Sequence, residues 1–375
     1  MNSIQLINPD TMYTSEEVTE YLRVSLRTTQ RLLKSGLLSS FKIHGQYRIK
    51  GIDILNYLNQ VRVDINDSAY EQENHKPIKL VNLLAINPIE VNLNVELAKK
   101  ISENEQEFLD RISLFREKIT LDMGFISPGI RFSDNSNLDE NNFKILIHGI
   151  DIYKDKAENL DDLLNKIEKV IKKYSYEIIS REEVAVILDN LRKVYPVIIE
   201  EVMADDNNFE NKISIGQLTK ILQALLKEQI SIRNMKIILE SIADIIPFSK
   251  NHEVIVNKVR ENLSRQICSS LTSTDIIEVI TLSDSLEKQL IASLKEENDG
   301  SKYLSIDYKM ANQIREQLSL INKDKSNSVI LCNQDIRRHL KDLIERHFPD
   351  INLISYREVA KEYRIKEIHQ LSLAN

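Results

Sequence analysis

Residues 13–58 restrict the fold more than any other stretch of this chain, because they carry start and stop signals for two short helices. Thr14 and Glu17 stand three positions apart, the spacing of a capping box that opens a helix running to about residue 23. Ser25 is a favourable N-cap for a second helix, and Gly36 can adopt the left-handed conformation that ends one. The segment therefore predicts two helices joined by a tight turn.

The same segment is basic, whereas the rest of the chain is acidic. Residues 12–62 contain eight lysines and arginines against four acidic residues. The whole chain has 50 basic and 57 acidic residues and a net charge of -7. Everything outside the segment therefore sums to about -11, and only the N-terminal part is electrostatically suited to phosphate.

The predicted second helix has a basic outward face. Arg27, Arg31 and Lys34 recur at helical spacing, with Thr28 and Gln30 beside them. An arginine can donate two hydrogen bonds to guanine in the major groove, whereas lysine and threonine contact mainly phosphates. We therefore expect this face to bind double-stranded DNA.

A short hairpin is predicted after the two helices. Apolar and basic residues alternate in residues 41–43 and 47–49, around a turn that needs Gly45. Residues 51–58 then suit a short closing helix. The residues expected to contact DNA are Ser25, Arg27, Thr28, Gln30, Arg31, Lys34, Lys42, His44, Gln46 and Arg48.

Helix, turn, helix, wing and helix in this order resemble the excisionase/MerR-like winged helix-turn-helix family over about 46 residues. The chain departs from that pattern at Leu26, where a polar residue is common, and at Thr29, where the family usually has an aliphatic residue. The resemblance implies a DNA-binding domain. The alternative is a winged helix that contacts protein.

The remaining sequence predicts a helix-rich, multidomain α+β protein. Residues 66–77 are polar without apolar periodicity and are typical of a linker. Apolar spacing predicts a helix around residues 108–119, followed by strands at 130–132 and 143–147. Further helices are expected at 160–174, 181–194, 215–227, 232–246 and 251–270, with stops at Pro196 and Pro247. The last part mixes strands at 278–282, 329–332 and 352–355 with helices at 284–295, 308–320 and 334–348. The expected domains are 1–62 (winged helix), 63–82 (linker), 83–158 (early α/β subdomain), 159–272 (helical subdomain) and 273–375 (C-terminal α/β subdomain).

Catalytic and cofactor motifs are missing from the sequence. Eight glycines in 375 residues make glycine-rich nucleotide-binding folds improbable, and no metalloprotease, P-loop or CxxC pattern occurs. Cys268 and Cys332 sit in apolar surroundings, as expected for reduced thiols. No run of about 18 apolar residues occurs. We therefore expect a cytoplasmic protein without a membrane span, which is not an enzyme and holds no cofactor or metal.

Several colinear blocks resemble the soluble cytoplasmic region of the flagellar and type III secretion export gate (FHIPEP family, FlhA-like). They cover about 290 residues, and the most distinctive is VILCNQDIRRHLKDLIERHFPDINLISYREV. The family's membrane half and its FHIPEP loop are absent. The segment after Gly149 is also short, because residues 153–158 lead almost at once into Leu160. The resemblance therefore implies a trimmed early subdomain.

In export gates a surface dimple receives complexes of secretion chaperones and their substrates. The resemblance places this role on Ile112, Asp122 and Phe125. Ile112 and Phe125 could equally be core residues, and Asp122 could be an ordinary carboxylate at a helix end.

Two functions remain open on the sequence alone. The preferred one is a cytoplasmic DNA-binding transcriptional regulator, whose export-gate-like body binds protein partners or forms a homo-oligomer. The alternative is a non-membrane accessory protein of type III or flagellar secretion, which binds chaperone–substrate complexes or export-apparatus proteins such as the gate ring. DNA binding would separate the two.

Overall fold

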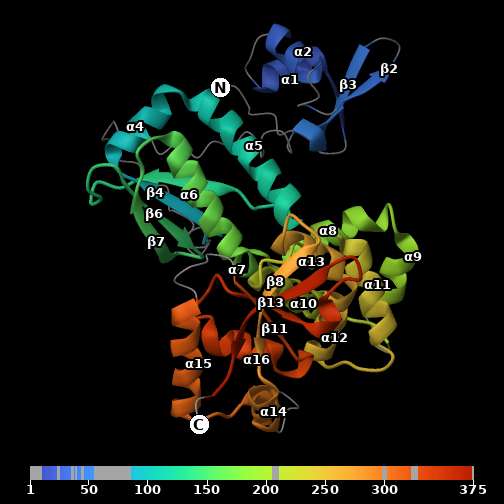
Figure 1. Cartoon of the computed structure of the whole chain (residues 1–375). Coiled ribbons are helices and arrows are strands. Elements are labelled where there is room, and N and C mark those ends of the chain that lie inside the picture. Colours follow the sequence, from blue (N-terminus) through green and yellow to red (C-terminus); the bar gives the residue numbers. More distant parts are fainter. Residues whose placement is uncertain are drawn as a thin grey trace. The chain divides into compact units, whose positions relative to one another are not determined.

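The computed structural model describes residues 11–22, 26–34, 38, 40–43, 46–54, 86–204, 211–297, 302–321 and 328–373. The chain divides into two compact units, Met1–Ile78 and Lys79–Asn375. Figure 1 shows the elements of both units. Within the described ranges, no helix is both long enough and apolar enough to cross a membrane.

The N-terminal unit contains two short helices and a three-stranded antiparallel sheet with the order β1-β3-β2. Its elements are β1 (Met12–Thr14), α1 (Ser15–Leu22), α2 (Leu26–Lys34), β2 (Phe41–Ile43) and β3 (Gln46–Lys50). Residues 51–54 are also helical, and Gly36 lies outside the described residues. The helices and hairpin occupy the predicted places, and β1 was not expected. Membership of the winged helix-turn-helix family stays a prediction.

The predicted capping box forms at the start of α1. The Glu17 amide donates to Thr14 Oγ1 at 3.2 Å, and the Thr14 amide donates to Glu17 Oε2 at 2.8 Å. Thr29, which departs from the winged-helix pattern, is fully buried, and its hydroxyl accepts a hydrogen bond from Thr19 Oγ1 at 2.9 Å. The buried polar group is therefore satisfied, which lowers the cost of placing it in a core.

The larger unit begins with a four-stranded sheet of order β5-β4-β6-β7, in which β4 and β5 are parallel and the other pairs antiparallel. Its elements are β4 (Ile89–Leu93), α4 (Val95–Glu103), α5 (Glu105–Met123), β5 (Ile130–Asp134), β6 (Asn142–Ile147) and β7 (Ile150–Lys156). The predicted helix around residues 108–119 lies inside α5, and the two predicted strands lie in β5 and β6. The sequence did not predict β4 or β7.

A helical part follows directly after β7. Its helices are α6 (Leu160–Lys173), α7 (Ser175–Ile178), α8 (Arg181–Arg192), α9 (Pro196–Val202), α10 (Ile215–Lys227), α11 (Met235–Ile245), α12 (His252–Asn262) and α13 (Ser264–Leu271). Capping boxes open α8 at Ser180 and α10 at Ser214. Such caps satisfy free amides at helix starts, and they explain why the predicted starts are close to the observed ones.

The C-terminal part contains a four-stranded parallel sheet of order β12-β11-β8-β13. Its elements are β8 (Ile276–Leu282), α14 (Asp284–Ala292), β9 (Leu294–Glu296), β10 (Lys302–Leu304), α15 (Tyr308–Ile321), β11 (Val329–Cys332), α16 (Gln334–Ile344), β12 (Asn352–Ser355), the 3-10 helix η2 (Tyr356–Glu358) and β13 (Arg364–Leu371). β11 is buried throughout, as expected for a central parallel strand. The unpredicted β13 is a largely exposed edge strand.

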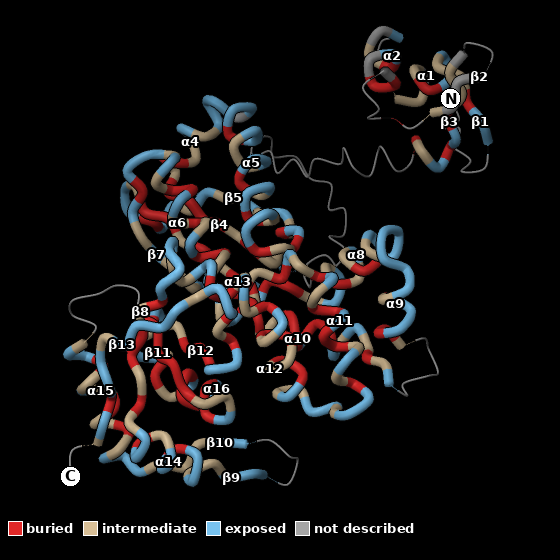
Figure 2. The backbone as a smooth tube through the Cα atoms, turned by 45° about the vertical axis from the view of Figure 1, so that its right-hand side comes forward, coloured by how far each residue is buried: buried red, intermediate tan, exposed pale blue. Residues whose placement is uncertain are grey.

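One hydrophobic core runs through most of the larger unit. It extends from Ile89 in β4 to Ala360 beyond η2, and it crosses the boundaries predicted at residues 158 and 272. A second cluster, between Ile280 and Leu371, fills the C-terminal part. Figure 2 shows these buried segments along the strands and α10. Because the first core is continuous, the three parts of this unit support one another.

Gly124 fixes a close approach inside this unit. It ends α5 in the left-handed conformation, with φ of 87°. A Cβ at this position would lie 2.1 Å from the Arg233 backbone nitrogen. Next to it, the Ile232 amide donates to the Met123 carbonyl at 2.9 Å. The end of α5 therefore packs directly on the chain between α10 and α11.

Candidate protein-interaction site

Helices α5 and α6 are joined by a ladder of ion pairs. In each of three pairs the partner lies 50 positions further along the chain, so the two helices run parallel. The pairs are Arg111 with Asp161 at 2.6 Å, Lys118 with Glu168 at 2.9 Å, and Asp122 with Lys172 at 2.6 Å. The ladder holds α5 in a fixed position beside α6.

The three residues assigned to the chaperone dimple do not share one surface. Asp122 is exposed and paired with Lys172, and Ile112 is half-buried. Phe125 is 1% exposed and belongs to the hydrophobic core. Phe125 can contact a partner only if this core opens. The partner-binding role therefore stays a prediction for the three residues, and the burial of Phe125 agrees with the alternative that it is a core residue.

The exposed face of α5 carries apolar residues that the sequence analysis did not select. Leu114 and Leu121 are 66% and 48% exposed and lie seven positions apart, on one side of the helix. Leu114 also borders a groove of about 420 Å³ between α5 and α6. Apolar residues spaced i, i+4 and i+7 along the helix predict its buried face, and these leucines are not among them. Their position outside that set was the sequence signal for an exposed apolar face.

A second apolar surface lies on the helical part, at the start of α9. Val194 and Val197 are 65% and 75% exposed, and with Tyr195 and Ile198 they line a groove of about 470 Å³ against α11. Pro196 occupies the first turn of α9, where its missing amide costs nothing. Exposed apolar patches of this kind mark contacts with other proteins. Pro196 is predicted from the sequence as a helix stop, whereas the structure places it at the start of α9, and no sequence pattern predicted the groove.

A buried cluster of charges joins the helical part to the C-terminal part. Arg260 on α12 binds Glu358 of η2 through two hydrogen bonds of 2.8 Å. Glu228 at the end of α10 accepts from Arg260 at 2.9 Å and from Arg337 on α16 at 2.6 Å. Both arginines are at most 2% exposed and Glu358 is fully buried. Two carboxylates therefore neutralise two guanidinium groups inside the protein.

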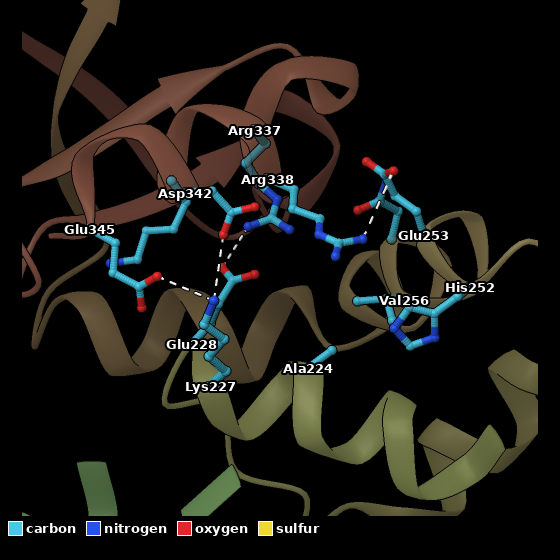
Figure 3. A pocket seen from close by; sticks show the side chains of 12 residues that line it. Ala224, Lys227, Glu228, His252, Glu253, Val256, Arg337, Arg338, Asp342 and Glu345 are labelled. Carbon is cyan, nitrogen blue, oxygen red and sulfur yellow. Dashed lines mark hydrogen bonds and ion pairs between the residues drawn. The ribbon is translucent and has the colours of Figure 1, made fainter. Parts of the chain in front are cut away.

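Glu228 links this cluster to the surface. Burial alone raises the pKa of its carboxyl, but Arg260 and Arg337 attract the carboxylate strongly and hold the pKa at about 2. Figure 3 shows Glu228 and Arg337 pointing toward one another, while Lys227 reaches toward Asp342 and Glu345. The pocket that Arg337 and Glu228 line together is small, about 80 Å³. The cluster connects the helical part to the C-terminal part.

The N-terminal residues expected to contact DNA are only partly described. The backbone places Arg27, Arg31 and Lys34 on α2, Lys42 on β2 and Gln46 on β3, while Ser25 and His44 lie outside the described residues. Thr28 is half-buried and Gln30 is exposed. Arg48 is half-buried, and its Nη1 donates to the Tyr47 carbonyl at 3.1 Å.

The sequence of the FHIPEP family matches residues 35–164 and 155–364. The chain belongs to the FHIPEP family. The two matched stretches meet at residues 155–164, where β7 passes into α6 and where the sequence predicts a shortened segment. Most of the larger unit and part of the N-terminal unit therefore carry the family pattern.

Curated relatives and solved structures agree with this assignment. The chain is 27% identical to the flagellar biosynthesis protein FlhA of Bacillus subtilis, over 81% of this chain and 52% of that protein. It thus spans about half the length of this relative. The Chlamydia pneumoniae CdsV structure covers 77% of this chain with a TM-score of 0.69, 22% identity and 98% of its own length. The structure of nonameric EPEC SctV-C covers 79% of this chain with a TM-score of 0.67 and 20% identity, and the match includes all of its own length.

These findings overturn the preferred function drawn from the sequence. The prediction of a DNA-binding transcriptional regulator is wrong, because the chain belongs to the FHIPEP family and is similar to a flagellar biosynthesis protein. The family match also starts at residue 35, inside the predicted DNA-binding domain. The predicted double-stranded DNA partner depended on that function and is likewise not supported. The error has a physical reason: a small basic helix pair with a hairpin is compatible with many functions, and its charge alone does not specify DNA.

Proposed function

We propose that this protein works in type III or flagellar protein export, at the cytoplasmic side of the export apparatus, by binding other proteins. The family match over residues 35–364 carries this proposal. The exposed apolar surfaces on α5 and α9 support it, because each offers contact area that a monomer leaves uncovered.

We further propose that copies of the chain assemble into a ring through the groove at the start of α9. The solved EPEC SctV-C is nonameric. Val194 and Val197 provide exposed apolar area, and Lys236 and Glu240 on α11 provide polar groups at the rim of the groove. An apolar centre with a polar rim is the usual composition of a protein interface.

Light scattering coupled to size-exclusion chromatography tests the ring. Val197→Asp should shift the wild-type oligomer toward monomer, because a carboxylate would lose its water on assembly without gaining a partner. Leu320→Asp on α15 is the matched control, since Leu320 is 67% exposed and lies outside the groove. A monomeric wild-type protein at high concentration, or equal oligomers in both variants, would refute ring formation through this surface.

We also propose that Ile112, Asp122 and the leucines on the exposed face of α5 bind a complex of a secretion chaperone and its substrate. The ion-pair ladder supports this proposal by fixing the position of α5. Leu114→Asp should weaken binding of a purified type III chaperone complex by about tenfold or more, the loss expected when an apolar contact is replaced by a desolvated charge. Unchanged affinity would rule this face out.

For the N-terminal unit we infer a winged helix that docks on protein. The order of α1, α2 and the β2–β3 hairpin supports the fold, and the export assignment of the chain favours a protein partner. Removing residues 1–78 should then weaken association with export-apparatus proteins while leaving Lys79–Asn375 folded. Equal association with and without this unit would contradict the docking role.

A further inference from the structure

Lys341 on α16 is a buried cation without a salt-bridge partner. The residue is 8% exposed, and its Nζ donates hydrogen bonds to the carbonyl oxygens of Pro349 at 3.0 Å and Ile351 at 2.9 Å. Among the residues that the structure describes, no carboxylate forms an ion pair with it. Burial lowers the pKa of Lys341. Buried lysines are normally paired with a carboxylate at contact distance, whereas the contacts of this ammonium are backbone carbonyls.

Lys341 lines a cleft in Lys79–Asn375 with a volume of about 700 Å³. The cleft lies between the ends of α6 and α10, helix α13, and the segment that joins α16 to β12. Lys169 and Lys173 stand on its α6 wall, one helical turn apart and both exposed. In the described ranges neither forms an ion pair, although Lys173 Nζ lies 5.8 Å from the centre of the Tyr174 ring.

The charge of the cleft is opposite to that of the surrounding unit. Lys79–Asn375 carries 41 basic and 48 acidic side chains, whereas six lysines and arginines but three carboxylates line the cleft. Glu228 is already bound to Arg260 and Arg337, and Lys172 and Lys227 are bound to carboxylates as well. Among the described residues, the cations left to attract a ligand in the cleft are therefore Lys169, Lys173 and Lys341. A cleft of one sign attracts ligands of the other sign.

The cleft also has an apolar side. The half-buried Leu271 lines it together with the half-buried rings of Tyr174 and Tyr176, whose planes are nearly parallel and whose centres are 6.4 Å apart. A small inorganic anion would leave this area in water. A peptide that combines carboxylates with apolar side chains would cover both parts of the cleft.

We propose that this cleft binds an acidic segment of a partner protein, whose carboxylates contact Lys341, Lys169 and Lys173 while its apolar side chains cover Leu271 and the ring of Tyr176. The inference rests on the proposed export function for the class of ligand, a protein, and it is independent of ring assembly.

The test uses the full chain and a short fluorescein-labelled peptide of alternating Glu and Leu, with fluorescence anisotropy as the readout. Lys169→Glu combined with Lys173→Glu should raise the Kd about tenfold, because two exposed attractions become repulsions. Lys341→Met should raise it about 30-fold, since this charge is buried. Added salt should reduce both effects on the Kd. It should reduce the effect of the exposed pair more than that of Lys341.

Lys99→Glu combined with Lys100→Glu is the matched control. These lysines are adjacent and exposed on α4, they do not line the cleft, and the charge change is the same. This variant should bind the peptide as the wild type does. The exposed α6 pair keeps the test valid if Lys341→Met fails to fold.

Two results would overturn the proposal. One is a lack of dependence on charge, seen either as unchanged affinity in the Lys169→Glu, Lys173→Glu variant or as wild-type affinity for a peptide in which Gln replaces Glu. The other is displacement of the peptide by inorganic phosphate, together with equal binding of a Glu–Ser peptide, which would leave a simple anion site. An unchanged oligomer in Val197→Asp together with intact peptide binding would refute the ring interface alone, so the two failures are distinguishable.

Discussion

Arg260 and Glu358 face each other through two parallel hydrogen bonds of 2.8 Å, in a place where neither side chain is more than 2% exposed. They lie 98 positions apart in the chain. The pair therefore connects α12 to η2 at a point that water cannot reach. Removing one partner leaves an unpaired buried charge, which is far more costly than removing both.

Arg260→Met should lower the free energy of unfolding by about 3 to 5 kcal/mol, because it leaves Glu358 buried without its main partner. Combining it with Glu358→Leu should restore part of this loss. Urea unfolding of the two single variants and the double variant measures the coupling. Additive losses would show that the pair contributes little beyond its two side chains.

Glu228 should make stability depend on pH. Its folded pKa of about 2 lies below the ordinary value of 4.5, so its contribution is fully present above about pH 4.5 and is lost as pH falls toward 2. The destabilisation caused by Glu228→Gln should therefore shrink by about 2 kcal/mol between about pH 6 and about pH 3. Urea unfolding at the two pH values checks this, and an equal loss at both would contradict it.

Gly124→Ala should destabilise the protein by more than about 2 kcal/mol, because a Cβ would meet the Arg233 backbone at 2.1 Å and because φ is 87°. Gly149→Ala is the control. Its φ of 78° imposes similar strain, but the nearest atom to its Cβ would be Ile86 Cγ2 at 3.4 Å. It should cost about 1 kcal/mol. Equal thermal unfolding of both variants would mean that the close approach is relaxed in solution.

Phe125→Ala should cost about 3 to 5 kcal/mol, since Phe125 is a core residue. Asp122→Asn should cost less than about 1 kcal/mol, because its ion pair with Lys172 is partly exposed. Thermal unfolding measures both. A partner-binding role for Asp122 then requires weaker chaperone binding in a variant whose stability is nearly that of the wild type.

Local signals in the sequence predicted many elements. The expected helix at 215–227 coincides with α10, and the helix expected at 160–174 ends one residue later than α6. The helix expected over 251–270 is two helices, α12 and α13, which break at Leu263. Periodicity continued through that break because both helices bury residues on the same core.

The sites were harder to predict than the elements. Arginine and glutamate are residue types that usually lie at the surface. Only the tertiary fold shows that Arg260, Arg337 and Glu358 are buried together. Lys341 is similar, since nothing local marks a lysine whose ammonium is enclosed. Pairings across 98 or 109 positions leave no periodic signal in a single sequence.

The constant spacing of the ladder between α5 and α6 has a consequence for changes in chain length. All three pairs depend on the register within each helix, at steps of seven and four residues, and none depends on the path between residues 123 and 160. Residues can thus be gained or lost in the loops that connect these strands without disturbing any rung, whereas a change inside a strand would shift its side chains to the other face of the sheet. A single residue inserted in the middle of α5 would instead rotate everything beyond it by about 100° and separate the later rungs. We therefore expect homologous chains to vary in length in the segment before α6, which is already short here. We expect no such variation inside α5 or α6.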